Sequence, residues 1–301
     1  MASSAFLFPG QGAQYLGMGA ALCDKFPPAL QRFQQASQIL GYDLLEICKN
    51  GPLDKLNSTV FSQPAIYVSS LAALDLLNSE DPQASQSCKI TAGLSLGEYT
   101  ALTFAGAISF ADGVALVKER GEAMQAASEK SPSGMLSVIG AEKEQIEQIC
   151  ADAGEVGLIK MANFLCPGNI VVSGDDQACL MFEKIASEKG IRTIKLAVAG
   201  AFHTSLMEPA LDRLAKILST TSIASTNVPV LANVDALEHS DPVSIKNKLA
   251  RQVVEPVLWE NCIRKILDSG VEKLYEVGPG RVLAGLAKRI NRKIEIVNIQ
   301  A

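Results

Sequence analysis

The sequence has little of what metal and nucleotide sites need. It contains two histidines, and its seven cysteines are scattered without a Cys-x-x-Cys pair, so the spacing of a zinc site is missing. There is no Gly-Lys-Ser/Thr tripeptide, which excludes a P-loop. The glycine-rich stretch at 10–14 also lacks the third glycine of a dinucleotide loop, because Tyr15 stands in its place. We therefore expect no metal and no bound nucleotide cofactor.

The sequence also lacks a charge excess and a long apolar run. The net charge is −5, so no general basic field indicates a nucleic acid partner. Polar residues interrupt the apolar runs before the ~20 residues that a membrane span requires. The first strand is predicted from about residue 5, which leaves no room for a targeting peptide. The protein either never had one or is a processed form, and its dispersed thiols favour a reducing compartment.

The length of 301 residues suggests two domains, or one large domain with an insertion. Strands and helices alternate, which predicts an α/β fold with a mostly parallel sheet. Within 131–198 the order changes to β-α-β-β-α-β, the split pattern of a small ferredoxin-like domain. We expect this domain to be inserted into a large domain made of 1–130 and 199–301. Strands are predicted at 5–8, 88–92, 135–139, 156–162, 170–173, 191–198, 228–232, 273–277 and 294–297.

A Gly-x-Ser-x-Gly pattern at 93–97 follows an apolar strand and precedes an apolar helix. The two glycines permit a tight strand-to-helix turn that exposes Ser95, as in a nucleophile elbow. The beginning of the helix offers the free amide of Leu96. An ordinary Gly-Ser turn is the alternative interpretation.

A serine nucleophile needs a base, and only His203 and His239 are available. His239 lies in the polar stretch EHSDP and is predicted to be a solvated surface residue. His203 lies in AGAFHTSLMEP, between a strand and a helix, and is the candidate base. The alternative is a histidine that only fills the core.

Arg120 lies on the apolar stripe of its helix, with Leu116 and Met124 as neighbours. A buried guanidinium without a partner costs several kcal/mol, about 3–5 when a buried pair is broken. An internal ion pair or a side chain that reaches solvent would satisfy it. The functional interpretation is a planar group that waits for a substrate carboxylate.

Several ordered motifs span nearly the whole chain: FPGQGAQ at 8–14, GLSLGEYTALTFAGA at 93–107, AGAFHTSLMEPA at 199–210 and YEVGPG at 275–280. Together they resemble the malonyl-CoA:acyl carrier protein transacylases of type II fatty acid synthesis. The resemblance implies a hydrolase-like α/β domain with a ferredoxin-like insertion. It implies ping-pong transfer of a malonyl group from coenzyme A to the phosphopantetheine thiol of the carrier protein, by a monomer without a cofactor.

The resemblance also assigns roles to residues that the patterns alone do not mark. The implied site residues are the oxyanion donors Gln11 and Leu96, the carboxylate-binding pair Arg120 and Gln63, the histidine-orienting carbonyl near Gln252, and the lining residues Asn163 and Phe202. Leu94 and the stretch NFLCPGN resemble plastid-type members. We therefore expect the plastid stroma if the source is eukaryotic, and otherwise the bacterial cytoplasm.

Acidic carrier proteins would need a basic docking surface. The candidates lie near the C-terminus and in the small domain: Lys288, Arg289, Arg292, Lys293, Arg192 and Lys195. A solvated helix face is the alternative for this cluster.

Two other functions share some of these features. A serine hydrolase would have the elbow, the base and the order serine before histidine, but it would not explain Arg120 or the insertion. A catalytically dead carrier-binding module would not need Ser95, His203 and Arg120 together.

Overall fold

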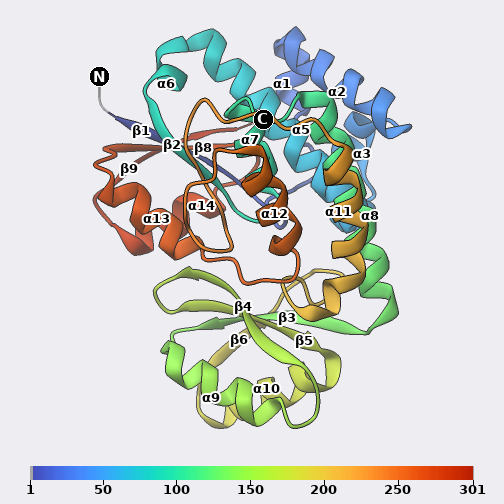
Figure 1. Ribbon diagram of the computed structural model, residues 1–301, viewed down its shortest axis with the longest axis vertical. Coiled ribbons are helices and arrows are strands. Elements are labelled where there is room, and N and C mark those ends of the chain that lie inside the picture. Colours follow the sequence, from blue (N-terminus) through green and yellow to red (C-terminus); the bar gives the residue numbers. More distant parts are fainter. Residues whose placement is uncertain (1–2, 301) are drawn as a thin grey trace.

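The computed structural model describes residues 3–300, which form two sheets with helices around them (Figure 1). The larger sheet has five parallel strands in the order β7-β2-β1-β8-β9. Their bounds are β1 Ser4–Phe8, β2 Cys88–Gly93, β7 Val230–Leu231, β8 Lys273–Val277 and β9 Glu295–Ile299. The predicted α/β fold with a mostly parallel sheet is confirmed.

The central strand β1 shows why the sheet is buried on both faces. Phe6 and Phe8 point into one apolar cluster, and Ala5 and Leu7 point into the other. A strand that is apolar on both faces fits a parallel sheet covered by helices on each side.

Most helices contribute to the cluster around Phe6. They are α1 Ala20–Lys25, α2 Pro27–Leu40, α3 Leu44–Asn50, α4 Leu53–Asn57, α5 Thr59–Glu80, α6 Pro82–Gln86, α7 Gly97–Phe104, α8 Phe110–Lys130, α11 Glu208–Thr220 and α12 Pro242–Gln252. A short 3₁₀ turn, Ser205–Met207, precedes α11. The opposite cluster includes α13 Trp259–Asp268 and α14 Val282–Ile290.

Helix α5 is long and apolar enough, by length and composition, to cross a membrane. However, 78% of its most apolar 18-residue window is buried inside the protein. Its place in this fold is that of a core helix.

The smaller sheet lies below the large domain in Figure 1, and α9 and α10 cover its far side. Its elements are β3 Ser133–Ile139, α9 Lys143–Ala153, β4 Ile159–Cys166, β5 Asn169–Asp175, α10 Asp176–Glu188 and β6 Arg192–Lys195. The strands pair antiparallel in the order β4-β5-β3-β6. The predicted β-α-β-β-α-β order is therefore present, while the domain limits of 131 and 198 stay a prediction.

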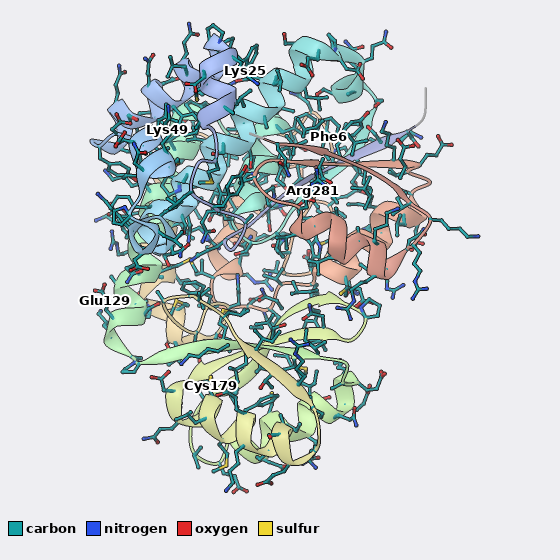
Figure 2. All side chains as sticks on the ribbon, turned by 180° about the vertical axis from the view of Figure 1, so that it is seen from behind. Phe6, Lys25, Lys49, Glu129, Cys179 and Arg281 are labelled. Carbon is teal, nitrogen blue, oxygen red and sulfur yellow. The ribbon has the colours of Figure 1, made fainter. Side chains whose placement is uncertain are left out.

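The two domains also differ in the reverse view, where Phe6 lies in the upper domain and Cys179 in the lower one (Figure 2). The lower domain has its own apolar cluster, which includes Phe182 and the thiol-bearing Cys179. Each sheet thus has a separate core.

Some element boundaries differ from those predicted. Strand β4 lies at Ile159–Cys166 instead of 156–162, and its register against β5 shifts twice. The polar stretch at 79–87 contains helix α6, which Asp81 caps through its side chain. Short helices of this kind have too few turns to show a periodic pattern.

Candidate active site

Ser95 lies at the sharp turn between β2 and α7, at the carboxyl end of the parallel sheet. Its φ of 50° is left-handed, a strained conformation for a residue with a side chain. The turn needs its glycines, since a Cβ on Gly93 would lie 1.8 Å from the carbonyl carbon of Gly97. A Cβ on Gly10 would lie 2.3 Å from the Leu94 carbonyl oxygen, so the glycine-rich loop after β1 packs directly on this turn.

The structure brings His203 to Ser95. The Ser95 Oγ atom lies 3.0 Å from His203 Nε2, and His203 Nδ1 lies 2.7 Å from the carbonyl oxygen of Gln252. Because a carbonyl only accepts, Nδ1 carries the proton and Nε2 is left to accept one from the serine. Burial, with Arg120 nearby, lowers the pKa of His203 to about 4. The imidazole is therefore neutral and able to act as a base near pH 7.

Arg120 reaches the same point from helix α8 and is 1% exposed. Its Nη1 donates to Gln63 Oε1 at 2.8 Å, and its Nη2 donates to Ser95 Oγ at 2.9 Å and to Gln252 Oε1 at 3.0 Å. Among the described residues, no carboxylate forms an ion pair with it. A buried guanidinium with only neutral acceptors is suited to receive an anionic ligand.

The two predicted oxyanion donors flank the elbow. Gln11 lies in the loop that packs on Leu94, and Leu96 is the N-cap of α7. Within residues 3–300, neither backbone amide donates a hydrogen bond to a protein group. The Gln11 side chain points elsewhere, to Thr59 Oγ1 at 3.4 Å.

The two predicted lining residues lie near the domain junction without hydrogen bonds to Ser95 or His203. Asn163 belongs to β4 and forms an isolated bridge with Val257. Its Oδ1 atom is buried and has no partner among the described residues. Phe202 is buried, and its carbonyl oxygen accepts a hydrogen bond from Ser173 Oγ of the small domain.

Sequence reasoning missed two buried residues behind the elbow. Asn233, just after β7, accepts the Ser95 amide on its Oδ1 at 2.6 Å and donates its Nδ2 to Gly93 O at 2.8 Å. Glu98 of α7 accepts from the Asn233 amide and from Gln252 Nε2. The only local signal was a polar residue beyond the carboxyl end of a predicted parallel strand, where ligand sites gather.

The prediction for His239 was wrong. Its side chain is buried instead of solvated, with 1% of the residue exposed. Its backbone amide donates to Val230 O, which draws the polar stretch EHSDP against β7. Its Nε2 atom then lies 3.3 Å from Glu98 Oε1, a long-range contact that no local pattern announces.

Two of the predicted docking residues form hydrogen bonds within the protein. Lys288 Nζ donates to the carbonyl oxygen of Ile294 at 2.6 Å, and Arg289 Nη2 donates to that of Pro167 at 3.0 Å. Arg289 therefore connects α14 with the β4–β5 turn of the small domain. Arg192 and Arg292 form no ion pair in the part of the chain that the structure describes.

No group of three or more His, Cys, Asp or Glu side chains within residues 3–300 is arranged to hold a metal ion. The site is thus built from a serine, a neutral histidine, an arginine and two unpaired amides. This set can attack an acyl carbon, stabilise the oxyanion and bind a carboxylate next to it.

Comparisons with known proteins agree with this chemistry. Residues 5–296 match the acyl transferase domain family. The mitochondrial malonyl-CoA-acyl carrier protein transacylase of Mus musculus is 42% identical over 303 residues, covering 96% of this chain and 79% of the relative. The malonyl CoA-acyl carrier protein transacylase of Coxiella burnetii has a similar structure, with a TM-score of 0.95, 38% identity and coverage of 99% and 94%. A malonyl-transacylase in complex with its type II polyketide acyl carrier protein has a TM-score of 0.94 at 36% identity, covering 99% and 96%.

Proposed function

The chain belongs to the acyl transferase domain family, and from that premise we propose that it transfers malonyl groups from coenzyme A to an acyl carrier protein. It is an acyltransferase, and its relatives over nearly the whole chain are named for this reaction. The observation that carries the choice of substrate is Arg120, a buried cation 2.9 Å from Ser95 Oγ with only neutral partners.

In the first half-reaction, Ser95 Oγ attacks the thioester carbon of malonyl-CoA while His203 Nε2 takes its proton. The amides of Gln11 and Leu96 hold the oxyanion of the tetrahedral intermediate, and one such donor is worth ~10²–10³ in rate. The carbon–sulfur bond then breaks, and the coenzyme A sulfur takes the proton from His203. Malonyl-serine remains.

In the second half-reaction, the phosphopantetheine thiol of the carrier protein replaces coenzyme A. His203 accepts the thiol proton, the sulfur attacks the malonyl-serine carbonyl, and Ser95 recovers its proton as the ester bond breaks. No aspartate is needed to orient the base, because the Gln252 carbonyl holds Nδ1 at 2.7 Å.

Arg120 holds the free carboxylate of the malonyl group, with Gln63 beside it. In the structure its guanidinium donates to Gln63, Gln252 and Ser95. A carboxylate is a stronger acceptor than these neutral oxygens, because charge-assisted hydrogen bonds are roughly twice as strong. The same pocket would disfavour the neutral acyl groups that an esterase hydrolyses.

The carrier protein and the compartment follow from the same proposal. An acidic carrier would dock at the junction of the domains, near Arg192 and Arg289. We propose that the chain works as a monomer in a reducing compartment, the plastid stroma or the bacterial cytoplasm. Its seven free thiols suit such a compartment.

Intact mass of the protein incubated with malonyl-CoA alone tests the nucleophile. We expect a malonyl adduct on the wild type, none on Ser95→Ala, and discharge of the adduct when carrier protein is added. Steady release of coenzyme A without an adduct would favour the hydrolase instead.

The role of Arg120 has a separate test. Arg120→Ala is expected to lower the ratio of malonyl to acetyl transfer by about tenfold or more, as the loss of a charged hydrogen bond costs about 1.5–3 kcal/mol. Initial rates with both acyl-CoA substrates measure this ratio. An unchanged ratio would remove Arg120 from carboxylate binding.

A further inference from the structure

A second layer of buried polar groups lies behind the active site. Glu98, Asn233 and Gln252 are fully buried, and His239 is 1% exposed. Glu98 Oε2 accepts from the Asn233 amide at 2.9 Å and from Gln252 Nε2 at 2.7 Å. One carboxylate oxygen thus connects two residues that each contact the reacting groups.

Asn233 and Gln252 both contact residues of the active site directly. Asn233 Oδ1 accepts the Ser95 amide, which holds the elbow in its left-handed conformation. Gln252 contacts Ser95 as well, since its Nε2 also donates to the Ser95 carbonyl at 3.1 Å. Its side-chain oxygen accepts from Arg120, and its backbone oxygen orients His203.

Glu98 is one of the two acceptors that set the orientation of the Gln252 amide. An amide side chain can be turned over, so that its nitrogen and oxygen exchange places. Oε2 of Glu98 is an acceptor, so it requires the Gln252 nitrogen on its side. The Gln252 oxygen must then face the Arg120 guanidinium, which has only donors.

The other carboxylate oxygen faces His239. Glu98 Oε1 and His239 Nε2 lie 3.3 Å apart, and neither atom has a hydrogen-bond partner among the described residues. Leaving two such buried atoms unpaired is unfavourable, and a single proton between them satisfies both. Burial raises the pKa of Glu98 to about 7, which makes its carboxyl group able to supply that proton.

We infer that Glu98 and His239 are positioning residues for the acyl transfer, sharing one proton so that the carboxyl group holds Gln252 and Asn233 in place. The pair fixes the direction of the Gln252 amide, and through it Arg120 and His203. The role is geometric and needs no net charge on Glu98. The part of the test that compares malonyl with acetyl transfer rests on the proposed function, because that comparison uses the carboxylate-binding role of Arg120.

Two substitutions of Glu98 separate geometry from charge. Glu98→Leu removes both oxygens, so the Gln252 side chain loses its shortest hydrogen bond and is held against Arg120 less firmly. We expect the malonyl-to-acetyl ratio to fall at least about tenfold. Glu98→Gln keeps an oxygen for Gln252 and an N–H for His239, so it should retain the ratio within about threefold.

A second readout does not depend on the substrate carboxylate. The rate at which a fluorophosphonate labels Ser95 reports the reactivity of the serine, which depends on the elbow, on His203 and on the hydrogen bond from Arg120. Glu98→Leu should slow labelling at least about tenfold, and Glu98→Gln should restore it. If Arg120→Ala leaves the malonyl preference intact, the proposed function has failed on that point, and labelling still decides the present inference.

Glu276 offers a matched control. It is also fully buried, and it accepts the amides of Leu283 and Ala284 at the start of α14. Glu276→Leu and Glu276→Gln should lower the melting temperature with less than twofold change in labelling or in the acyl ratio.

The outcomes are decisive in each case. Wild-type labelling and acyl ratio in a folded Glu98→Leu overturn the inference, and so does a Glu98→Gln variant as impaired as Glu98→Leu. If Glu98→Leu does not fold, His239→Leu replaces it and should slow labelling about threefold, while His239→Gln, which keeps an N–H donor, should not. Equal labelling by His239→Leu and the wild type would then overturn the inference.

Discussion

The two domains bury very different groups. In the small domain, the buried polar side chains of the described residues are Ser137 and Ser173. Among the described residues, the large domain buries five acidic or basic side chains, namely Glu98, Arg120, His203, His239 and Glu276. The small domain is therefore held by apolar packing, whereas the large domain keeps a polar network in its core. Buried polar groups cost stability unless they are paired. Their concentration in one region therefore indicates an active site.

The contrast is not complete, because the small domain touches the site. Ser173 Oγ donates to the carbonyl of Phe202, the residue before the candidate base. Asn163 forms a bridge with Val257 and has a buried side-chain oxygen without a partner among the described residues. We therefore expect the small domain to contribute positioning at the junction and its far cluster to contribute stability.

After Ser95→Ala, which should form no adduct, His203→Ala should have the largest effect on activity. Removal of a general base typically costs about 10²–10⁴ in rate, and this variant should form the malonyl-serine adduct correspondingly slowly while remaining folded. Rapid-quench measurement of adduct formation gives the rate, and circular dichroism checks the fold. A loss below tenfold would show that another group accepts the Ser95 proton.

Phe182→Ala tests the other side of the comparison. Phe182 is fully buried in the apolar cluster of the small domain. Its truncation should lower the free energy of unfolding by about 3–5 kcal/mol, measured by urea titration. The malonyl-to-acetyl ratio of the folded fraction should not change. A changed ratio would mean that this cluster also shapes the acyl pocket.

The buried histidines should also give the stability a characteristic pH dependence. Burial lowers the pKa of His203 and His239 from 6.5 to about 4. Between these values the unfolded chain binds protons that the folded chain does not, so the free energy of unfolding rises with pH. Glu98, with its pKa raised to about 7, and Glu276, whose pKa burial also raises, act in the opposite direction, so the histidine contribution is obtained by comparing variants.

His239→Gln should therefore reduce this slope by up to about 1.4 kcal/mol per pH unit. Urea titrations at several pH values from 4.5 to 6.5 would measure it. Phe182→Ala should lower the stability equally at every pH and leave the slope alone. The same slope in His239→Gln and the wild type would contradict the burial of a neutral imidazole.

The smallest effect is expected at the surface. Arg192→Glu in the small domain and Arg289→Glu in the large domain should each raise the KM for carrier protein about threefold at low salt. High salt should abolish the difference. Lys25→Glu serves as the control, since Lys25 lies at the far end of the large domain (Figure 2). An equal effect of all three substitutions would indicate a non-specific electrostatic effect of the net charge and no specific docking site.

Local patterns predicted the parallel sheet, the small-domain order and the elbow, because each depends on residues close in the chain. The strand at 156–162 was misplaced because β4 is irregular at 161–166, where its register shifts. Helix α6 was missed because five residues show no helical period.

The first layer of the site was accessible to sequence reasoning for a different reason. With two histidines in the chain, the choice of base was narrow, and Arg120 stood out on an apolar stripe. Asn233, Glu98 and the burial of His239 could not be predicted, because contacts across more than 100 residues create their environments. Gln252 came only from the family resemblance.

The left-handed backbone at Ser95 and His203 has a consequence for anyone who engineers this protein. Each such conformation costs about 1–3 kcal/mol, and glycine adopts it freely. A selection for heat resistance alone would therefore accept glycine at both positions and yield a hardier, inert protein. Thermal stability and catalytic activity conflict at these two residues. A screen for thermostable variants must therefore assay the reaction in every round.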